Sequence, residues 1–169
     1  LEYHRGTYTG MARNKRYNRK SEFAYQEAEL FSLMAQKRAG LAYPKARLNA
    51  GWEVILRNQF HDILPGSSIK EVYEDSKAEY EKIAEESAEM LQSARQALAD
   101  FLAAPQGALV AFNPAGFDNN GPVLCDGPAD VTVLSGGAPL PTQRTHDSRL
   151  VFDGGMIPGK GYKAFALAP

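Results

Sequence analysis

The predicted second helix ends inside the stretch Asn58-Gln59-Phe60-His61-Asp62-Ile63-Leu64-Pro65-Gly66-Ser67. Adjacent proline and glycine break a helix, because proline lacks a backbone N–H and glycine favours turn conformations. The His-Asp pair of this stretch therefore stands just before a rigid turn. A metal site or a sugar-binding site makes use of that placement, whereas a purely structural helix does not. The stretch both separates two helices and is the first candidate site.

Helical patterns lie on both sides of this stretch. Before it, apolar spacing predicts a helix over 21–39, with Ser21 as N-cap, and a second helix from Pro44 to about Asp62. After it, Ser68-Ile69-Lys70-Glu71 has the pattern of a capping box that begins a third helix. The predicted apolar stripes are Phe23, Leu30, Phe31, Leu33 and Met34 in the first helix and Leu48, Trp52, Ile55, Leu56 and Phe60 in the second.

The third helix carries a seam of period 3.5, which is typical of a long helix packed lengthwise against neighbours. Small and polar residues in the seam favour a bundle over a free-standing coiled coil. The seam comprises Ile69, Tyr73, Ser76, Tyr80, Ile83, Ser87, Met90, Ala94, Ala97 and Phe101.

The composition changes at Pro105. Beyond it, lysine and glutamate nearly vanish, glycine and proline become frequent, and short apolar runs predict strands. These 65 residues are few for a complete sandwich, so a truncated β domain and a small sheet packed on the helices both remain open. The predicted class is segregated α+β, a three-helix bundle followed by an all-β segment. The predicted strands are 108–112, 122–125, 131–134, 150–152 and 162–167.

Bulk composition narrows the function classes only slightly. The net charge of −1 gives no overall attraction to nucleic acid or acidic membranes, and no apolar run is long enough to span a bilayer. The single cysteine, Cys125, excludes an internal disulfide and is interpreted as a buried structural thiol. Because the chain starts at Leu1 without methionine, we expect it to be a piece of a longer polypeptide.

His61 is the candidate metal ligand that the residues themselves indicate. Successive residues of a helix are 100° apart, which places His61 opposite Trp52, on the side shared with Arg57 and Asn58. This position excludes the interpretation of His61 as a core residue. Neutral imidazole binds zinc well, but one histidine does not make a site. The chain has no His-Glu-x-x-His pair, so further ligands would have to come from elsewhere.

Two rival interpretations compete with a catalytic one. In the main rival, residues 21–103 form a non-catalytic helical module that binds a partner through an exposed groove. In the other, the basic run 13–20 contacts phosphates and Tyr17 stacks on a base. The overall neutrality of the chain favours a solvated or interdomain surface for this run. The glutamates of the long helix are interpreted as solvent contacts and not as a glycosidic acid/base pair.

Two motifs resemble the retaining α-mannosidases of glycoside hydrolase family 38. Residues 4–9 (His-Arg-Gly-Thr-Tyr-Thr) with 12–16 and 18–19 resemble the end of that family's catalytic domain, and 58–67 resembles its middle-domain motif in the bacterial and cytosolic-type variant. Residues 110–114 are similar to the entry into its β domains. The resemblance implies a catalytic-domain edge at 1–20, a three-helix middle domain at 21–104 and the start of a C-terminal β domain at 105–169.

The resemblance also implies roles for single residues. His61 would be one ligand of a catalytic zinc, and Asp62 would bind hydroxyl groups of the mannose. The nucleophile and the other ligands are expected upstream of this sequence, Glu2 is kept as a candidate acid/base, and Arg5 and Tyr8 are candidates to border the sugar site.

The same resemblance sets the expectations for the whole protein. It should hydrolyse terminal α-linked mannose from glycans, in the cytoplasm, with the glycan and the rest of its own chain as partners and neither nucleic acid nor membrane. The isolated chain, with a single zinc ligand, is expected to be inactive and largely metal-free.

Overall fold

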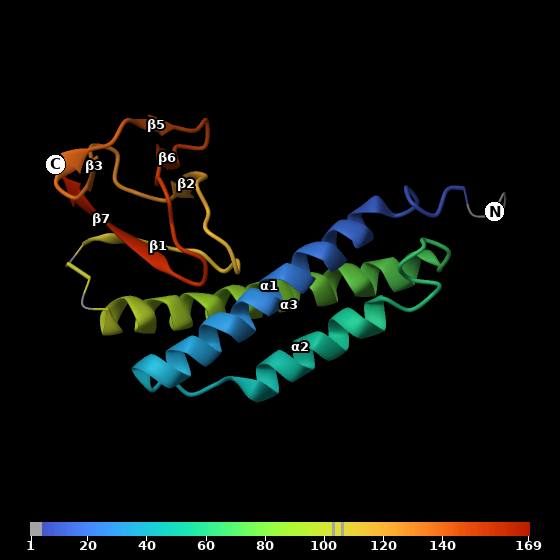
Figure 1. The fold of residues 1–169 in the computed structure, drawn as a ribbon. Helices are drawn as coiled ribbons and strands as arrows, with labels where there is room; N and C mark the ends of the chain where they lie inside the picture. The colour runs from blue at the N-terminus through green and yellow to red at the C-terminus, as the bar shows by residue number, and fades with distance from the viewer. Residues whose placement is uncertain (1–4, 103, 106) are drawn as a thin grey trace. The chain divides into compact units, whose positions relative to one another are not determined.

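The computed structural model describes residues 5–102, 104–105 and 107–169. The chain divides into two compact units, one ending at Leu98 and the other beginning at Ala99. Helices make up the first unit and antiparallel strands the second (Figure 1). This order confirms the predicted α+β class. None of the described helices combines the length and the apolar character that crossing a bilayer requires.

The helical unit contains α1 (Ala12–Ala39), α2 (Lys45–Asn58) and α3 (Lys70–Phe101). Buried residues recur in each helix at alternating spacings of three and four, which is the pattern of helices packed lengthwise. These seams are Asn14, Asn18, Ser21, Tyr25, Ala28, Ser32 and Ala35 in α1, Leu48, Gly51, Ile55 and Asn58 in α2, and Ser76, Tyr80, Ile83, Ser87, Met90 and Ala94 in α3.

The helix boundaries differ from the prediction at three points. The first helix begins at Ala12, and Ser21 is buried inside it instead of capping it. The polar run before Ser21 is helical because Asn14 and Asn18 lie on the buried seam. The second helix ends at Asn58, before the predicted Asp62.

The predicted capping box at Ser68 is also wrong. A capping box would pair the Ser68 N–H with the Glu71 carboxylate. In the structure that N–H donates to the Tyr73 hydroxyl, 3.1 Å away, and the Ser68 hydroxyl donates to the main-chain carbonyl of Asp62. Ser68 therefore ties the preceding turn to α3.

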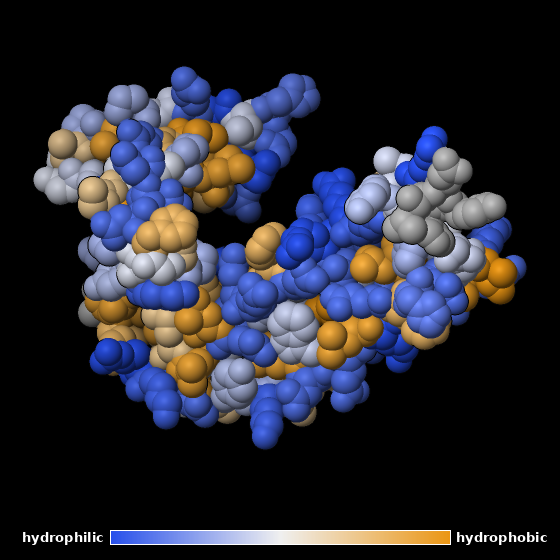
Figure 2. Space-filling view, turned by 45° about the vertical axis from the view of Figure 1, so that its right-hand side comes forward, coloured by the Kyte–Doolittle hydropathy of each residue, from blue (hydrophilic) through white to orange (hydrophobic). Residues whose placement is uncertain are grey.

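Small residues, which the predicted apolar stripes passed over, occupy much of the helical core. Phe23, Leu33, Leu56 and Phe60 are exposed, and hydrophobic side chains reach the surface among hydrophilic ones on the face drawn in Figure 2. Position 51 on the seam of α2 is occupied by glycine because the Tyr25 side chain lies against it. A Cβ there would stand 1.9 Å from the Tyr25 hydroxyl oxygen. The seam of α3 follows the prediction from Ser76 to Ala94 and then continues at Leu98, while Phe101 is exposed.

The β unit contains two antiparallel sheets, in the orders β1-β7-β3-β4 and β2-β6-β5. Val133, Leu150, Phe152 and Phe165 form its core, with the two phenylalanine rings 4.9 Å apart in an edge-to-face contact. The five predicted runs are all strands, and β4 and β5 were not predicted. The strands are β1 (Leu109–Phe112), β2 (Pro122–Cys125), β3 (Thr132–Ser135), β4 (Ala138–Pro139), β5 (Thr142–Arg144), β6 (Leu150–Asp153) and β7 (Tyr162–Ala168).

Cys125 ends β2 and packs against the core of the β unit while remaining half-buried. Burial, together with the neighbouring Asp126 carboxylate, raises the pKa of its thiol. A raised pKa lowers the thiolate fraction and therefore the reactivity of the sulfur. The structure agrees with a structural thiol, although a less buried one than expected.

Candidate functional site

Residues 59–68 form the turn that joins α2 to α3, called here the α2–α3 turn. Its backbone winds through short-range bonds, from the Phe60 N–H to the Arg57 carbonyl (3.1 Å) and from the Ile63 N–H to the Phe60 carbonyl (2.9 Å). The positive φ of Gly66 (101°), which favours glycine, lets the turn close. His61 thus lies in a turn and not in a helix. Its side chain is 77% exposed, which confirms that it is not a core histidine.

The residue before this turn, Asn58, is buried, with only 1% of its surface exposed. Its Nδ2 donates to the Val54 carbonyl (3.0 Å) and to Oε2 of Glu79 (2.8 Å) on α3. The same Glu79 carboxylate pairs with Arg57 at 2.6 Å. The prediction that Asn58 shares an outer face with His61 is wrong, because the seam of α2 passes through Asn58.

Gln59 links the start of the turn to the other two helices. Its Nε2 donates to Oδ1 of Asn18 and to Oε1 of Glu22, both 3.0 Å away on α1. Oδ1 of Asn18 also accepts a bond from the Tyr80 hydroxyl of α3 at 3.3 Å. Polar networks that are largely buried and hydrogen-bonded rigidify their surroundings. The first two residues of the motif therefore anchor the turn.

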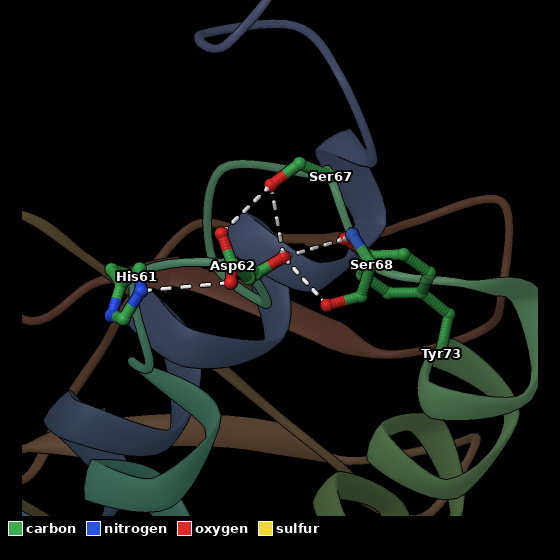
Figure 3. Close-up of polar contacts among 5 residues, drawn as sticks. All are labelled: His61, Asp62, Ser67, Ser68 and Tyr73. Atoms are coloured by element: carbon green, nitrogen blue, oxygen red, sulfur yellow. Dashed lines mark hydrogen bonds and ion pairs between the residues drawn. The ribbon is translucent and has the colours of Figure 1, made fainter.

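The carbonyl oxygen of Asp62 accepts hydrogen bonds from three hydroxyl groups (Figure 3). They come from Ser68 at 2.7 Å, Tyr73 at 3.3 Å and Ser67 at 3.4 Å. Tyr73 also donates to the Ile63 carbonyl at 3.1 Å. This fixes the main chain of Asp62, while its carboxylate stays 57% exposed. Tyr73 was expected on the apolar seam of the third helix, so its hydrogen bonds to the turn were not predicted, although a phenol at the start of a helix was an available signal.

His61 is held on two sides. Its Nε2 lies 3.5 Å from Oδ2 of Asp62, and its ring packs against the Phe60 ring with the centroids 4.1 Å apart. Both partners are neighbours in sequence, so the imidazole is oriented locally and remains open to solvent. Of the sequence-predicted residues, the structure thus brings His61 and Asp62 together as an exposed pair.

The N-terminal turns, residues 5–11, lie against the α2–α3 turn. Their backbones touch: a Cβ built on Gly66 would stand 3.1 Å from the carbonyl carbon and oxygen of Gly10. Between the two segments is an open pocket of about 1000 Å³. Its lining consists of Arg5, Gly6, Thr7, Tyr8 and Gly10 from the first segment and His61, Asp62, Pro65, Gly66 and Ser67 from the second.

The pocket combines a guanidinium, a phenol, an imidazole and a carboxylate. Such a set of donors and acceptors suits a ligand that carries several hydroxyl groups. Arg5 and Tyr8, the candidates for the border of a sugar site, lie in its wall. Glu2 and His4 lie outside the described residues.

Only part of a zinc site is available from these residues. A tetrahedral zinc site needs four ligands, of which three or four come from the protein. The exposed imidazole of His61 fits as one of them. Among the described residues, however, no group of three or more His, Cys, Asp or Glu side chains could hold a metal ion. A complete site would therefore require ligands from outside this part of the chain.

The family described as "Alpha mannosidase middle domain" matches residues 2–98. The chain is 40% identical over 111 residues to "Alpha-mannosidase 2C1" of Homo sapiens, covering 65% of this chain and 11% of that protein. It is 42% identical over 78 residues to "Alpha-mannosidase" of Saccharomyces cerevisiae, covering 43% of this chain and 7% of that protein. The chain thus spans about a tenth of the length of the curated relatives it matches.

Solved structures share the fold. An alpha-mannosidase from Enterococcus faecalis V583 superposes with a TM-score of 0.73 at 17% identity, covering 96% of this chain and 24% of that chain. A protein in the Glycosyl Hydrolase Family 38 from Enterococcus faecalis gives a TM-score of 0.69 at 18% identity, covering 96% and 25%. At these identities the likeness concerns the fold alone.

Proposed function

Because this chain belongs to the family 38 α-mannosidases, whose middle domain its residues 2–98 match, we propose that it forms part of a retaining enzyme that removes terminal α-linked mannose from glycans. One observation of the structure carries the proposal: the turns at 5–11 and the α2–α3 turn meet around one polar pocket. The relatives are α-mannosidases, so no observation favours the rival, a non-catalytic helical module.

In the proposed enzyme, His61 is a zinc ligand. Its imidazole reaches the pocket and is oriented by Phe60 and Asp62, and neutral imidazole is a preferred zinc ligand. Zinc, when bound, would supply Lewis-acid contacts to the sugar hydroxyl groups. The main chain that carries His61 is fixed by Asn58 and Gln59, so the ligand would be placed before the metal binds.

Asp62 is proposed to bind mannose hydroxyl groups. Its carboxylate is an acceptor that is exposed in the pocket, and the hydroxyl groups on its carbonyl hold the main chain in place. Arg5 and Tyr8 would border the same sugar as hydrogen-bond donors.

The described pocket lining does not contain the pair of carboxylates that a retaining glycosidase uses. Asp62 is its one acidic residue, and Glu2 lies outside the described residues. We therefore propose that the nucleophile, the acid/base and the further zinc ligands come from the remainder of the protein. The chain alone should be inactive and largely metal-free, and detectable hydrolysis of an aryl α-mannoside by it would contradict this.

The test of the zinc role is His61→Ala in the full-length protein, with His146→Ala as the matched control. His146 is exposed in the β unit, outside the pocket. We expect His61→Ala to lose most of the activity toward an aryl α-mannoside and most of the bound zinc, while its circular dichroism stays unchanged. Wild-type zinc content in His61→Ala would make His61 an ordinary surface residue.

Location and domain boundaries belong to the same proposal. The resemblance to the cytosolic-type branch supports a cytoplasmic location, and cell fractionation of the full-length protein tests it. The boundaries at 20 and 104 stay predictions, which limited proteolysis of the full-length protein would check.

A further inference from the structure

Lys15 lies on α1, outside the pocket lining, and contacts both segments that form the pocket. Its ammonium donates to the Gly10 carbonyl at 2.5 Å, to the Leu64 carbonyl at 2.9 Å and to the Pro65 carbonyl at 3.4 Å. The first acceptor belongs to the N-terminal turns, and the other two belong to the α2–α3 turn. An ammonium has three donors, and here each of them has a carbonyl acceptor.

These bonds are well placed to resist separation of the two segments. Lys15 is half-buried, and hydrogen bonds from an ionised donor are shorter and roughly twice as strong as neutral ones. The positive charge faces three main-chain carbonyl oxygens, which are strong hydrogen-bond acceptors. Gly10 and Gly66 allow the backbones to approach within reach of one side chain.

The acceptors stand close to the proposed site in sequence. Leu64 follows Asp62 by two residues, and Gly10 closes the turns that carry Arg5 and Tyr8. Holding the Leu64 and Gly10 carbonyls therefore sets the separation of the two pocket walls. Removing the ammonium would leave three carbonyls without this donor and would let the walls drift apart.

We infer that Lys15 is a positioning residue, which clamps the N-terminal turns to the α2–α3 turn and so places Arg5 and Tyr8 opposite His61 and Asp62. The effect of the clamp on hydrolysis rests on the proposed function, whereas the clamp itself does not. The inference also gives a role to one member of the basic run at 13–20. The Lys15 ammonium is engaged by three partly buried main-chain carbonyls.

The experiment compares Lys15→Met, Lys15→Arg and the control Lys20→Met in the full-length protein. Methionine keeps an apolar stem and removes the ammonium, and Lys20 is an exposed lysine of the same helix. The first readout is amide hydrogen exchange, followed by mass spectrometry. We expect Lys15→Met to exchange about 10-fold faster in peptides covering 5–11 and 59–68 but unchanged in peptides from the middle of the bundle. Lys20→Met should match the wild type.

The second readout is kinetic. Loss of a residue that supports a metal ligand typically costs about 10- to 100-fold in metal affinity or activity. We expect Lys15→Met to lower kcat/KM for an aryl α-mannoside and the zinc affinity, measured by chelator competition, by about that factor. Lys15→Arg, which keeps a charged donor, should regain part of both.

Several outcomes would overturn the inference. Wild-type exchange at 59–68 in Lys15→Met would show that there is no clamp, whatever the activity. Equal acceleration across the whole bundle would make Lys15 a general stabiliser. If Lys15→Met does not fold, wild-type exchange and kinetics in Lys15→Arg would overturn it, and faster exchange confined to the two turns would support it. A wild-type protein without α-mannosidase activity would refute the proposed function and leave the exchange result to decide on the clamp.

Discussion

The middle of the helical bundle and its α2–α3 turn are stabilised by different interactions. In the middle, Tyr25, Ile55 and Tyr80 are buried side chains of one core cluster, and the Tyr25 ring lies against the glycine at position 51. At the turn, polar side chains hold the backbone, while His61 and Asp62 face solvent. Stability and site geometry therefore depend on different residues in this unit and are separable. Mutations in the middle should change the free energy of unfolding, and those at the turn should change the site.

Among the substitutions, the largest effect on the free energy of unfolding is expected from Gly51→Ala in the middle of the bundle. Alanine is favoured over glycine in a helix by about 1 kcal/mol, but overpacking a core costs about 1–3 kcal/mol or more. Since the new Cβ would stand 1.9 Å from the Tyr25 hydroxyl, the clash should dominate. We expect a loss of about 3 kcal/mol by urea unfolding of the chain. In a Tyr25→Leu background, which removes the ring, the substitution should be nearly neutral, and an equal cost in both backgrounds would contradict this packing.

The second prediction for the middle of the bundle is that its free energy of unfolding falls at high pH. Burial and the nearby Glu86 raise the pKa of Tyr25 to about 12. Burial, together with Glu22 and Glu79, raises the pKa of Tyr80 as well. In the unfolded chain both phenols ionise near pH 10, so above that pH the unfolded state holds fewer protons than the folded state. Stability is therefore full below pH 10 and falls by about 1.4 kcal/mol per pH unit per tyrosine as the pH rises toward 12.

Urea unfolding between pH 9 and 11.5 measures this decline. Tyr25→Phe serves as the control, because it removes one of the two buried phenols while keeping the ring. We expect the variant to show about half of the wild-type slope. An unchanged slope would mean that Tyr25 ionises in the folded bundle as it does in water.

At the turn, Gly66→Ala should cost less, about 2 kcal/mol. The backbone of Gly66 has φ 101°, and the new methyl group would press on the Gly10 carbonyl at 3.1 Å. Gly40→Ala is the matched control, since its φ is 71° but nothing lies within 4 Å of the added atom. The difference between the two variants, measured by urea unfolding, reports the backbone contact. Equal costs would show that only the φ angle matters at Gly66.

The sequence predicted the two halves of this comparison unequally. The seam of α3 was predicted from Ser76 to Ala94 because its apolar, small and polar members recur with one period. The seam of α2 was misjudged, because an apolar stripe passes over Gly51 and Asn58, whose burial depends on the partner helix. The strands β4 and β5 were missed because they are two and three residues long and offer little pattern.

The sequence predicted the residues of the candidate site but not the residues that hold its backbone in place. The exposure of His61 was predicted from the phase of a helix that ends at Asn58, so only the turn signal of Pro65-Gly66 accounts for it in the structure. The hydroxyl of Tyr73 and the ammonium of Lys15 act on main-chain carbonyls of the turn. Backbone acceptors carry no side-chain signature, and the contact of Lys15 spans 49 residues. Such support becomes visible only when the chain is folded.

Tyr73→Phe should have a smaller effect than Gly66→Ala. It removes the hydroxyl that donates to the Asp62 and Ile63 carbonyls and accepts from the Ser68 N–H, and it keeps the ring. A typical hydrogen bond contributes about 1 kcal/mol net, so we expect a loss of about that size by urea unfolding. Amide hydrogen exchange should become faster only in residues 61–68. Tyr8→Phe, at an exposed position in the pocket lined by His61 and Asp62, should leave stability and exchange at the turn unchanged.

The smallest effect on stability is expected from Asp62→Ala and His61→Ala, each within about 0.5 kcal/mol of the wild type. Exposed ion pairs contribute little, and the 3.5 Å contact of these side chains is of that kind. The Ser68 and Tyr73 hydroxyl groups bind the main-chain carbonyl of residue 62, so they should remain in place when its carboxylate is removed, while Ser67 loses its 3.4 Å bond to Oδ1. Unfolding midpoints and amide exchange at 59–68 should therefore stay at wild-type values. A loss above 1 kcal/mol in Asp62→Ala would show that the carboxylate supports the turn, and stability and site geometry would then not be separable.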